Sequence, residues 1–106
     1  MNEEVLPGTP QGDTFDAVDP RLNVFALANG MDLSKGSDYR RLEWFAEGLE
    51  RGILIEPGEG DVYQLSVIAW PTGSDEIRGR TSLGDGLPAD DLIALLPSAI
   101  DSANEL

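Results

Sequence analysis

The sequence predicts an α+β fold in which a small antiparallel β-meander of about three strands is packed by helices and followed by a C-terminal amphipathic helix. Two patterns lead to this prediction. Between Ile53 and Trp70, two β-rich runs are separated by Pro57-Gly58-Glu59-Gly60, which is typical of a hairpin. The C-terminal segment instead repeats its apolar residues at the helical period, and these residues are Leu92, Leu95, Leu96, Ala99, Ile100, Ala103 and Leu106.

Length and composition predict one globular domain. The 106 residues are 41% hydrophobic and 25% charged, which is close to the average of ~45–50% and ~25%. A chain of this length buries roughly 65% of its unfolded surface, which is enough for one core. We expect residues 1–19, which have no periodicity, to form a flexible acidic N-terminal arm. Residues 20–106 are expected to form a single compact domain.

Two helices are predicted in the front half of the chain. The first covers residues 20–28 and ends at Asn29-Gly30, because Asp19-Pro20 combines a capping aspartate with a proline at the first helical position. Its apolar residues also alternate as in a strand, which leaves that alternative open. The second helix is predicted over 38–51, with Ser37 as its cap, because its apolar residues fall within one arc of about 120°.

The predicted strand from Asp61 to Trp70 has two unlike faces. The apolar face is the candidate core, and it contains Tyr63, Leu65, Val67 and Ala69. The other face mixes polar and large apolar groups, as a partner-facing surface would, and it contains Val62, Gln64, Ser66, Ile68 and Trp70. Residues 75–83 are expected to return as a third strand, with charged residues outward at the sheet edge.

The segment Gly84 to Ala89 formally matches the G-x-G-x-x-A pattern of dinucleotide-binding proteins. That motif binds pyrophosphate through free backbone N–H groups at a helix start, but Pro88 lacks this donor and Asp85 repels phosphate. We interpret Gly84-Asp85-Gly86 as a break before the last helix, and no cofactor is predicted. Pro97 lies on the polar side of that helix and predicts a kink or, alternatively, a break into two helices.

The formal net charge is −13, and it lies mainly at the two ends of the chain. Segments 1–20, 21–52, 53–82 and 83–106 each hold five acidic residues, against zero, five, two and zero basic residues. Nucleic-acid affinity depends on lysine and arginine contacts with phosphates, so direct nucleic-acid binding is not expected. The acidic start does not resemble a secretory signal, and no apolar run approaches a membrane span. We therefore expect a cytoplasmic protein with no membrane partner.

The chain contains no histidine and no cysteine, which removes the commonest general base, thiolate nucleophiles and zinc–thiolate sites. Asp13, Asp16 and Asp19 do not have the spacing of a calcium loop, so no metal site is predicted. We expect no enzymatic activity. The alternative is a carboxylate-based enzyme, which would require at least two close, buried acids in one pocket.

Two groups of residues are candidate partner-binding sites. One is centred on Trp44 of the predicted second helix, and the other on Trp70 of the second strand face, because tryptophan and arginine are enriched in binding hot spots. The candidates are Arg40, Arg41, Trp44, Arg51, Ile68 and Trp70. The alternative is a structural role, with Trp44 covered by the first helix or the N-terminal arm and Arg40 stacked on its ring.

These observations favour a small acidic cytoplasmic protein that acts as a non-catalytic protein–protein interaction module, such as an adaptor, an immunity protein or a chaperone-like protein. Its partner would be another protein with a basic or mixed surface, steered by charge. A second copy of the chain is an alternative partner. An alternative function is a nucleic-acid mimic that inhibits a DNA-binding protein. One lysine against six arginines is typical of a GC-rich bacterial genome.

Overall fold

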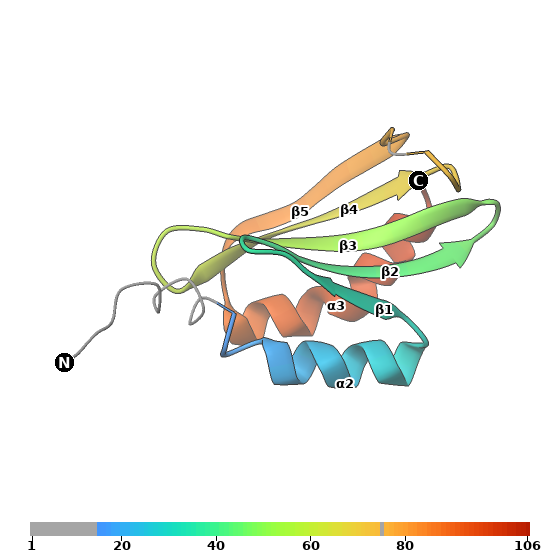
Figure 1. Ribbon diagram of the computed structural model, residues 1–106. Helices are drawn as coiled ribbons and strands as arrows, with labels where there is room; N and C mark the ends of the chain where they lie inside the picture. Colours follow the sequence, from blue (N-terminus) through green and yellow to red (C-terminus); the bar gives the residue numbers. More distant parts are fainter. Residues whose placement is uncertain (1–14, 75) are drawn as a thin grey trace.

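The computed structural model describes residues 15–74 and 76–106. The elements are α2 (Asp19–Asn29), β1 (Asp32–Lys35), β2 (Arg40–Ala46), β3 (Leu49–Pro57), β4 (Val62–Trp70), β5 (Gly79–Pro88) and α3 (Ala89–Asn104). The five strands form one antiparallel sheet in sequence order (Figure 1). The predicted α+β class is confirmed, with five strands in place of about three.

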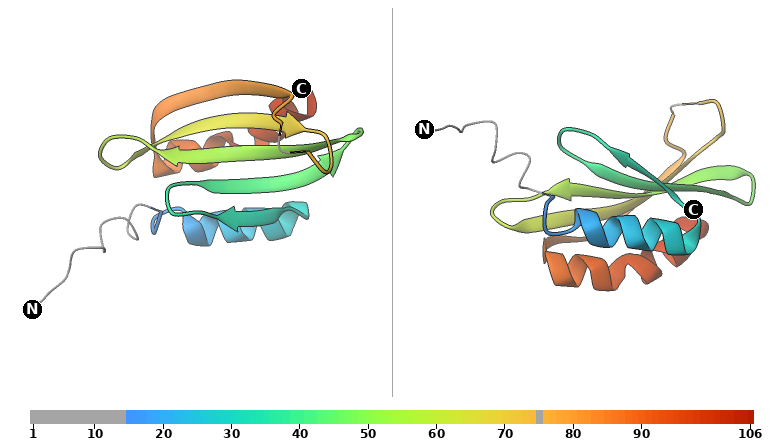
Figure 2. Two further views of the ribbon diagram at one scale, coloured as in Figure 1. Left: turned by 45° about the horizontal axis from the view of Figure 1, so that its top comes forward. Right: turned by 60° about the horizontal axis from the view of Figure 1, so that its bottom comes forward.

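Both helices lie against the same face of the sheet (Figures 1 and 2). Helix α3 contacts β3, β4 and β5, and α2 contacts β1. Among the described residues, no helix covers the opposite face, as the left view of Figure 2 shows. The fold therefore has two layers and leaves one side of a five-stranded sheet without a covering helix.

The core lies between the sheet and the two helices. Leu42, Ile53 and Val67 are neighbours across β2, β3 and β4, and all three are fully buried. Helix α2 adds Leu22 and helix α3 adds Leu96 from below. The predicted core face of the second hairpin strand is confirmed, because Tyr63, Leu65, Val67 and Ala69 are all buried.

The predicted first helix is confirmed as α2, and the alternative strand is wrong. It ends where Gly30 adopts a left-handed conformation with φ of 66°. Asp19 is not the cap, because Val18 precedes the helix and the Asp19 side chain binds Arg40 instead. Phe15 and Val18 are buried, so the described part of the predicted arm packs on the core. Residues 1–14 of that arm lie outside the described residues.

The helix predicted over 38–51 is wrong, because this segment forms β2 and the start of β3. The chain reverses at Glu47 and Gly48, whose φ values of 53° and 85° suit a two-residue hairpin turn. The predicted pairing of 53–56 with 61–70 is confirmed, but β3 begins earlier, at Leu49. This rearrangement supplies the additional strands.

The C-terminal part also differs in its boundaries. Gly84-Asp85-Gly86, predicted as a break, lies inside β5, which starts at Gly79 rather than at residue 75. Helix α3 then runs without interruption through Pro97, so the predicted alternative of two helices is wrong. Leu92, Leu96 and Ala99 face the core as the helical pattern predicts.

Candidate functional site

We call the side of the sheet that carries no helix the open face. Its side chains form three rows across the strands, namely Phe45–Glu50–Trp70, Glu43–Gly52–Ile68–Arg80 and Arg41–Leu54–Ser66–Ser82. Three of the six predicted partner-binding residues lie on it: Arg41, Ile68 and Trp70. The antiparallel register brings these residues together from β2 and β4.

The centre of the open face is built around Gly52 of β3. A Cβ atom at this position would lie 3.3 Å from the ring of Trp70 and 3.4 Å from both Arg41 Cγ and Ile68 Cγ1. The absence of a side chain therefore lets the indole ring approach β3, with the Arg41 guanidinium 5.3 Å from the ring centroid. Ile68 is buried among these neighbours.

Polar contacts fix both sides of this centre. Arg41 Nε forms an ion pair with Glu43, which also accepts a hydrogen bond of 3.4 Å from the Ser34 hydroxyl. On the other side, the Thr72 hydroxyl donates a hydrogen bond of 2.8 Å to Glu50, the cross-strand neighbour of Trp70. Phe45 continues the same row and is 60% exposed. The open face thus presents an ordered aromatic and arginine surface next to an exposed aromatic ring.

Trp44 and Arg51 lie on the other side of the sheet and pack against α3. Trp44 Nε1 donates a hydrogen bond of 3.1 Å to Asn104 Oδ1. Arg51 is only 3% exposed, and it donates to the backbone oxygens of Ala46 at 2.9 Å and Ala103 at 2.5 Å. A guanidinium suits this place because the carbonyl groups at a helix C-terminus carry partial negative charge. Trp44 is thus covered, as in the structural alternative, but by α3.

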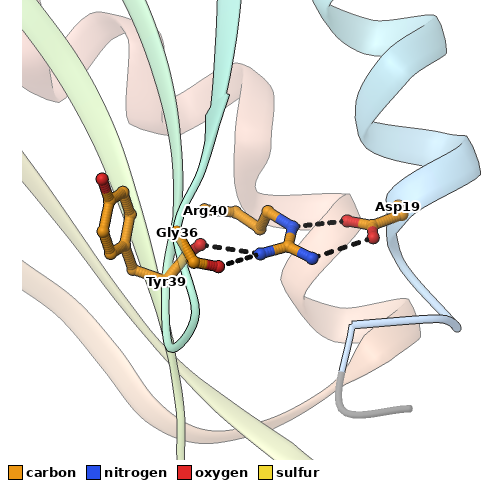
Figure 3. A network of polar contacts seen from close by, with 4 residues as sticks. All are labelled: Asp19, Gly36, Tyr39 and Arg40. Carbon is orange, nitrogen blue, oxygen red and sulfur yellow. Dashed lines mark hydrogen bonds and ion pairs between the residues drawn. The ribbon is translucent and has the colours of Figure 1, made fainter. Parts of the chain in front are cut away.

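Arg40 also has a structural environment (Figure 3). Its guanidinium binds both carboxylate oxygens of Asp19 at 2.8 and 3.1 Å and donates to the backbone oxygens of Gly36 and Tyr39. It stacks on Phe15, 4.1 Å from the ring centroid, rather than on Trp44. Arg40 therefore connects the start of α2 to the β1–β2 turn.

The open face also holds a polar hollow of about 140 Å³ beside β5. Its lining consists of Glu56, Gln64, Leu65, Ser66, Arg80, Ser82, Gly84 and Asp85. The two carboxylates here are not buried, since the Glu56 side chain is 39% exposed and Asp85 lies at the surface. This differs from the close, buried pair of acids that a carboxylate-based enzyme would require.

An apolar groove of about 490 Å³ lies between α2 and α3, and it is not among the sites predicted from the sequence. Its lining is Pro20, Arg21, Val24, Phe25, Ala28 and Ile93. Val24 and the neighbouring Leu27 are 68% and 84% exposed. One feature of the sequence does indicate this groove. Apolar residues occur on all sides of α2, whereas a surface helix normally has one apolar stripe.

Comparisons with protein-family models, with curated proteins and with solved structures found no match to this chain. In the described ranges, neither helix has the length and apolar character needed to cross a membrane. The same residues contain no group of three or more carboxylates placed to hold a metal ion.

Proposed function

We propose that the protein is a non-catalytic protein–protein interaction module that docks a partner protein on the open face. The observation that carries this proposal is the ordered cluster of Trp70, Arg41 and Ile68 on a sheet face with no helix over it. Tryptophan and arginine dominate binding hot spots because they bury a large area and still make directed polar contacts. An adaptor, an immunity protein and a chaperone-like protein would all use such a surface.

The charge of the chain supports a partner with a basic or mixed surface in the cytoplasm. The net charge of −13 would speed the encounter with a basic protein. The open face itself mixes signs, with Arg41 and Arg80 beside Glu43, Glu50 and Glu56. Steering would therefore come from the whole surface, while the contact would combine apolar burial with paired charges.

A matched pair of variants tests this proposal. Phe45→Thr with Trp70→Thr removes two aromatic rings from the open face but keeps residues that favour strands. Val24→Gln with Leu27→Gln removes a similar apolar area from the exposed side of α2. Tagged proteins are incubated with extract of the native cell, and the proteins that elute only at raised salt are compared.

The open-face variant should lose the salt-eluted partner but still unfold cooperatively in urea, at a lower midpoint because the Trp70 ring packs on β3 beside Ile68. The α2 variant should retain the partner, with a urea midpoint close to that of the parent protein. Loss of the partner in the α2 variant alone would contradict the proposal and assign docking to the groove between the helices. Retention in both variants would also contradict it.

The described carboxylates do not favour the nucleic-acid mimic, which would require a continuous acidic stripe. On α3, Asp90 and Asp91 lie at the start, and Asp101 lies near the end. At the helical rise of 1.5 Å per residue, Asp91 and Asp101 are about 15 Å apart along the axis. Glu56 is within 3.5 Å of Arg80, so part of its charge is compensated.

A further inference from the structure

The polar hollow on the open face is produced by two irregularities in β5. Along β4, Tyr63 pairs with Leu87, Leu65 with Gly84 and Ser66 with Ser82. Each of these two intervals contains one more residue on β5 than on β4, which is the pattern of a β-bulge. Bulges bend a strand and redirect its side chains. The segment Gly84-Asp85-Gly86 thus widens the space between β5 and β4, and Gly86 has the left-handed φ of 61° that favours glycine.

Ser66 gives the strongest indication that this hollow binds something. It lies on the open face beside Ser82 and lines the hollow, yet it is only 5% exposed. Its hydroxyl group has no hydrogen-bond partner within residues 15–74 and 76–106, although buried polar groups are normally paired. A ligand group inside the hollow would supply that partner.

The lining defines the charge of the ligand. Glu56 and Asp85 contribute two negative charges against one positive charge from Arg80, which gives a net charge of −1. The side chains of Arg80 and Glu56 are 3.5 Å apart and partly exposed, so they form a weak ion pair. The Glu56 carboxylate can therefore still accept further hydrogen bonds. An anion would meet two carboxylates here, whereas a cation would be attracted.

The remaining groups define the shape of the ligand. The hydroxyl groups of Ser66 and Ser82 and the amide oxygen of Gln64 all accept hydrogen bonds, as the carboxylates do. A guanidinium group carries five N–H donors in one plane and can use several acceptors at once. A volume of about 140 Å³ admits such a group.

We propose that this hollow receives the guanidinium group of an arginine side chain from the partner protein. The assignment rests on the proposed function, because it names the chemistry of the partner that docks on the open face. The hollow adjoins the centre of that face, since Arg80 is the cross-strand neighbour of Ile68. One partner segment can therefore cover Trp70 and insert an arginine beside Ser66.

The test uses N-acetyl-arginine amide, a capped arginine, as the probe in a titration followed by NMR of the full chain. The amide signals of Ser66, Ser82 and Gly84 and the side-chain amide of Gln64 should shift. N-acetyl-citrulline amide has the same shape without the charge and should bind about tenfold more weakly.

Two variants at partly exposed positions give opposite expected signs. Glu56→Gln should lower the affinity for the capped arginine by about threefold, because it removes a charged acceptor. Arg80→Gln should raise the affinity for the capped arginine by about threefold, because it removes the cation that competes for Glu56. An anion site would reverse both signs, and a reversal would overturn the assignment. Equal binding of arginine and citrulline, or no shift at millimolar probe, would overturn it as well.

These outcomes separate the assignment from the proposed function. If capture of the partner depends on Trp70 and Phe45 but the capped arginine does not bind, the arginine assignment is wrong and docking on the open face stands. If the capped arginine binds as expected but capture does not depend on those two aromatic residues, the docking proposal is wrong and the guanidinium site stands.

Discussion

Replacing Arg40 by methionine would remove a network of polar contacts that the structure places between α2 and the β1–β2 turn. The guanidinium donates two hydrogen bonds to Asp19 and two to backbone oxygens of Gly36 and Tyr39, and it stacks on Phe15. Methionine keeps an unbranched apolar side chain but no donor. The variant therefore tests the polar network rather than the packing of the side chain stem.

The expected loss follows from how deeply the pair is buried. The Arg40 and Asp19 side chains are 11% and 20% exposed, and removing one partner of a buried pair costs about 3–5 kcal/mol. The residual exposure places Arg40→Met near the lower end, at about 3 kcal/mol. Asp19→Asn should cost less, about 1–2 kcal/mol, because Arg40 keeps its two carbonyl acceptors. The double variant should cost less than the sum of the two single variants, since both remove the same contact.

Urea denaturation followed by tryptophan fluorescence measures these differences, with Trp44 and Trp70 as the probes. Arg80→Met is the matched control, because its ion pair with Glu56 is longer and largely exposed, and its cost should stay below about 0.5 kcal/mol. If Arg40→Met is no more destabilising than this control, or if the effects of Arg40→Met and Asp19→Asn simply add, the Arg40–Asp19 contact does not stabilise the fold as a buried pair.

Three further predictions concern the core and the open face. Arg51→Met should lower the free energy of unfolding by about 2–4 kcal/mol in urea, because the end of α3 loses a charged donor; a loss below about 0.5 kcal/mol would contradict this. Burial, reinforced by the charges of Asp61, Asp19 and Asp16, raises the pKa of the Tyr63 hydroxyl above 10.0. The folded state therefore keeps a proton that the unfolded chain loses, so the free energy of unfolding should fall as the pH rises through about 10. It should fall less in Tyr63→Phe. Urea titrations that give the same dependence on pH for both proteins would contradict this. Gly52→Ala should shift the Trp70 ring by a few tenths of an ångström, because the added Cβ would lie 3.3 Å from it. The shift should change the Trp70 fluorescence and reduce partner capture; unchanged emission would contradict this.

The parts of the fold that the sequence predicts are those specified by local periodicity. The apolar spacing of α3 indicates a helix and the alternation of β4 indicates a strand, and both elements are confirmed. Residues 38–51 are compatible with two types of element. Their apolar residues fall within one arc of a helix, and those around Leu42 and Trp44 also alternate as in a strand. The pairing of Leu42 with Ile53 decides in favour of strands, and Glu47-Gly48 is a weaker hairpin signal than Asn-Gly or Asp-Gly.

Because residues 38–51 form strands rather than the predicted helix, the predicted binding residues lie on two different faces of the sheet. On a helix, Arg40, Arg41 and Trp44 would share an outer side, whereas on β2 consecutive residues point to opposite faces. Arg41 consequently joins Trp70 on the open face, while Trp44 packs under α3. Arg41 and Trp70 are brought together by the register between strands, which depends on contacts between distant segments. The periodicity of one segment alone does not predict such contacts. Gly52, an isolated glycine in a β-rich run, was the local signal of a close approach.

The structure also changes how the charge of the chain acts. Residues 21–52 are balanced in sequence, but Arg40 and Arg51 are withdrawn into the fold, where Asp19 and the carbonyl groups of α3 compensate them. Three of the five acids of this segment, Asp32, Asp38 and Glu47, remain exposed. The surface over the middle of the chain is therefore more negative than its composition indicates. A basic partner would be attracted from most directions, and the two arginines on the open face, Arg41 and Arg80, are both beside carboxylates that limit their repulsion of an incoming cation.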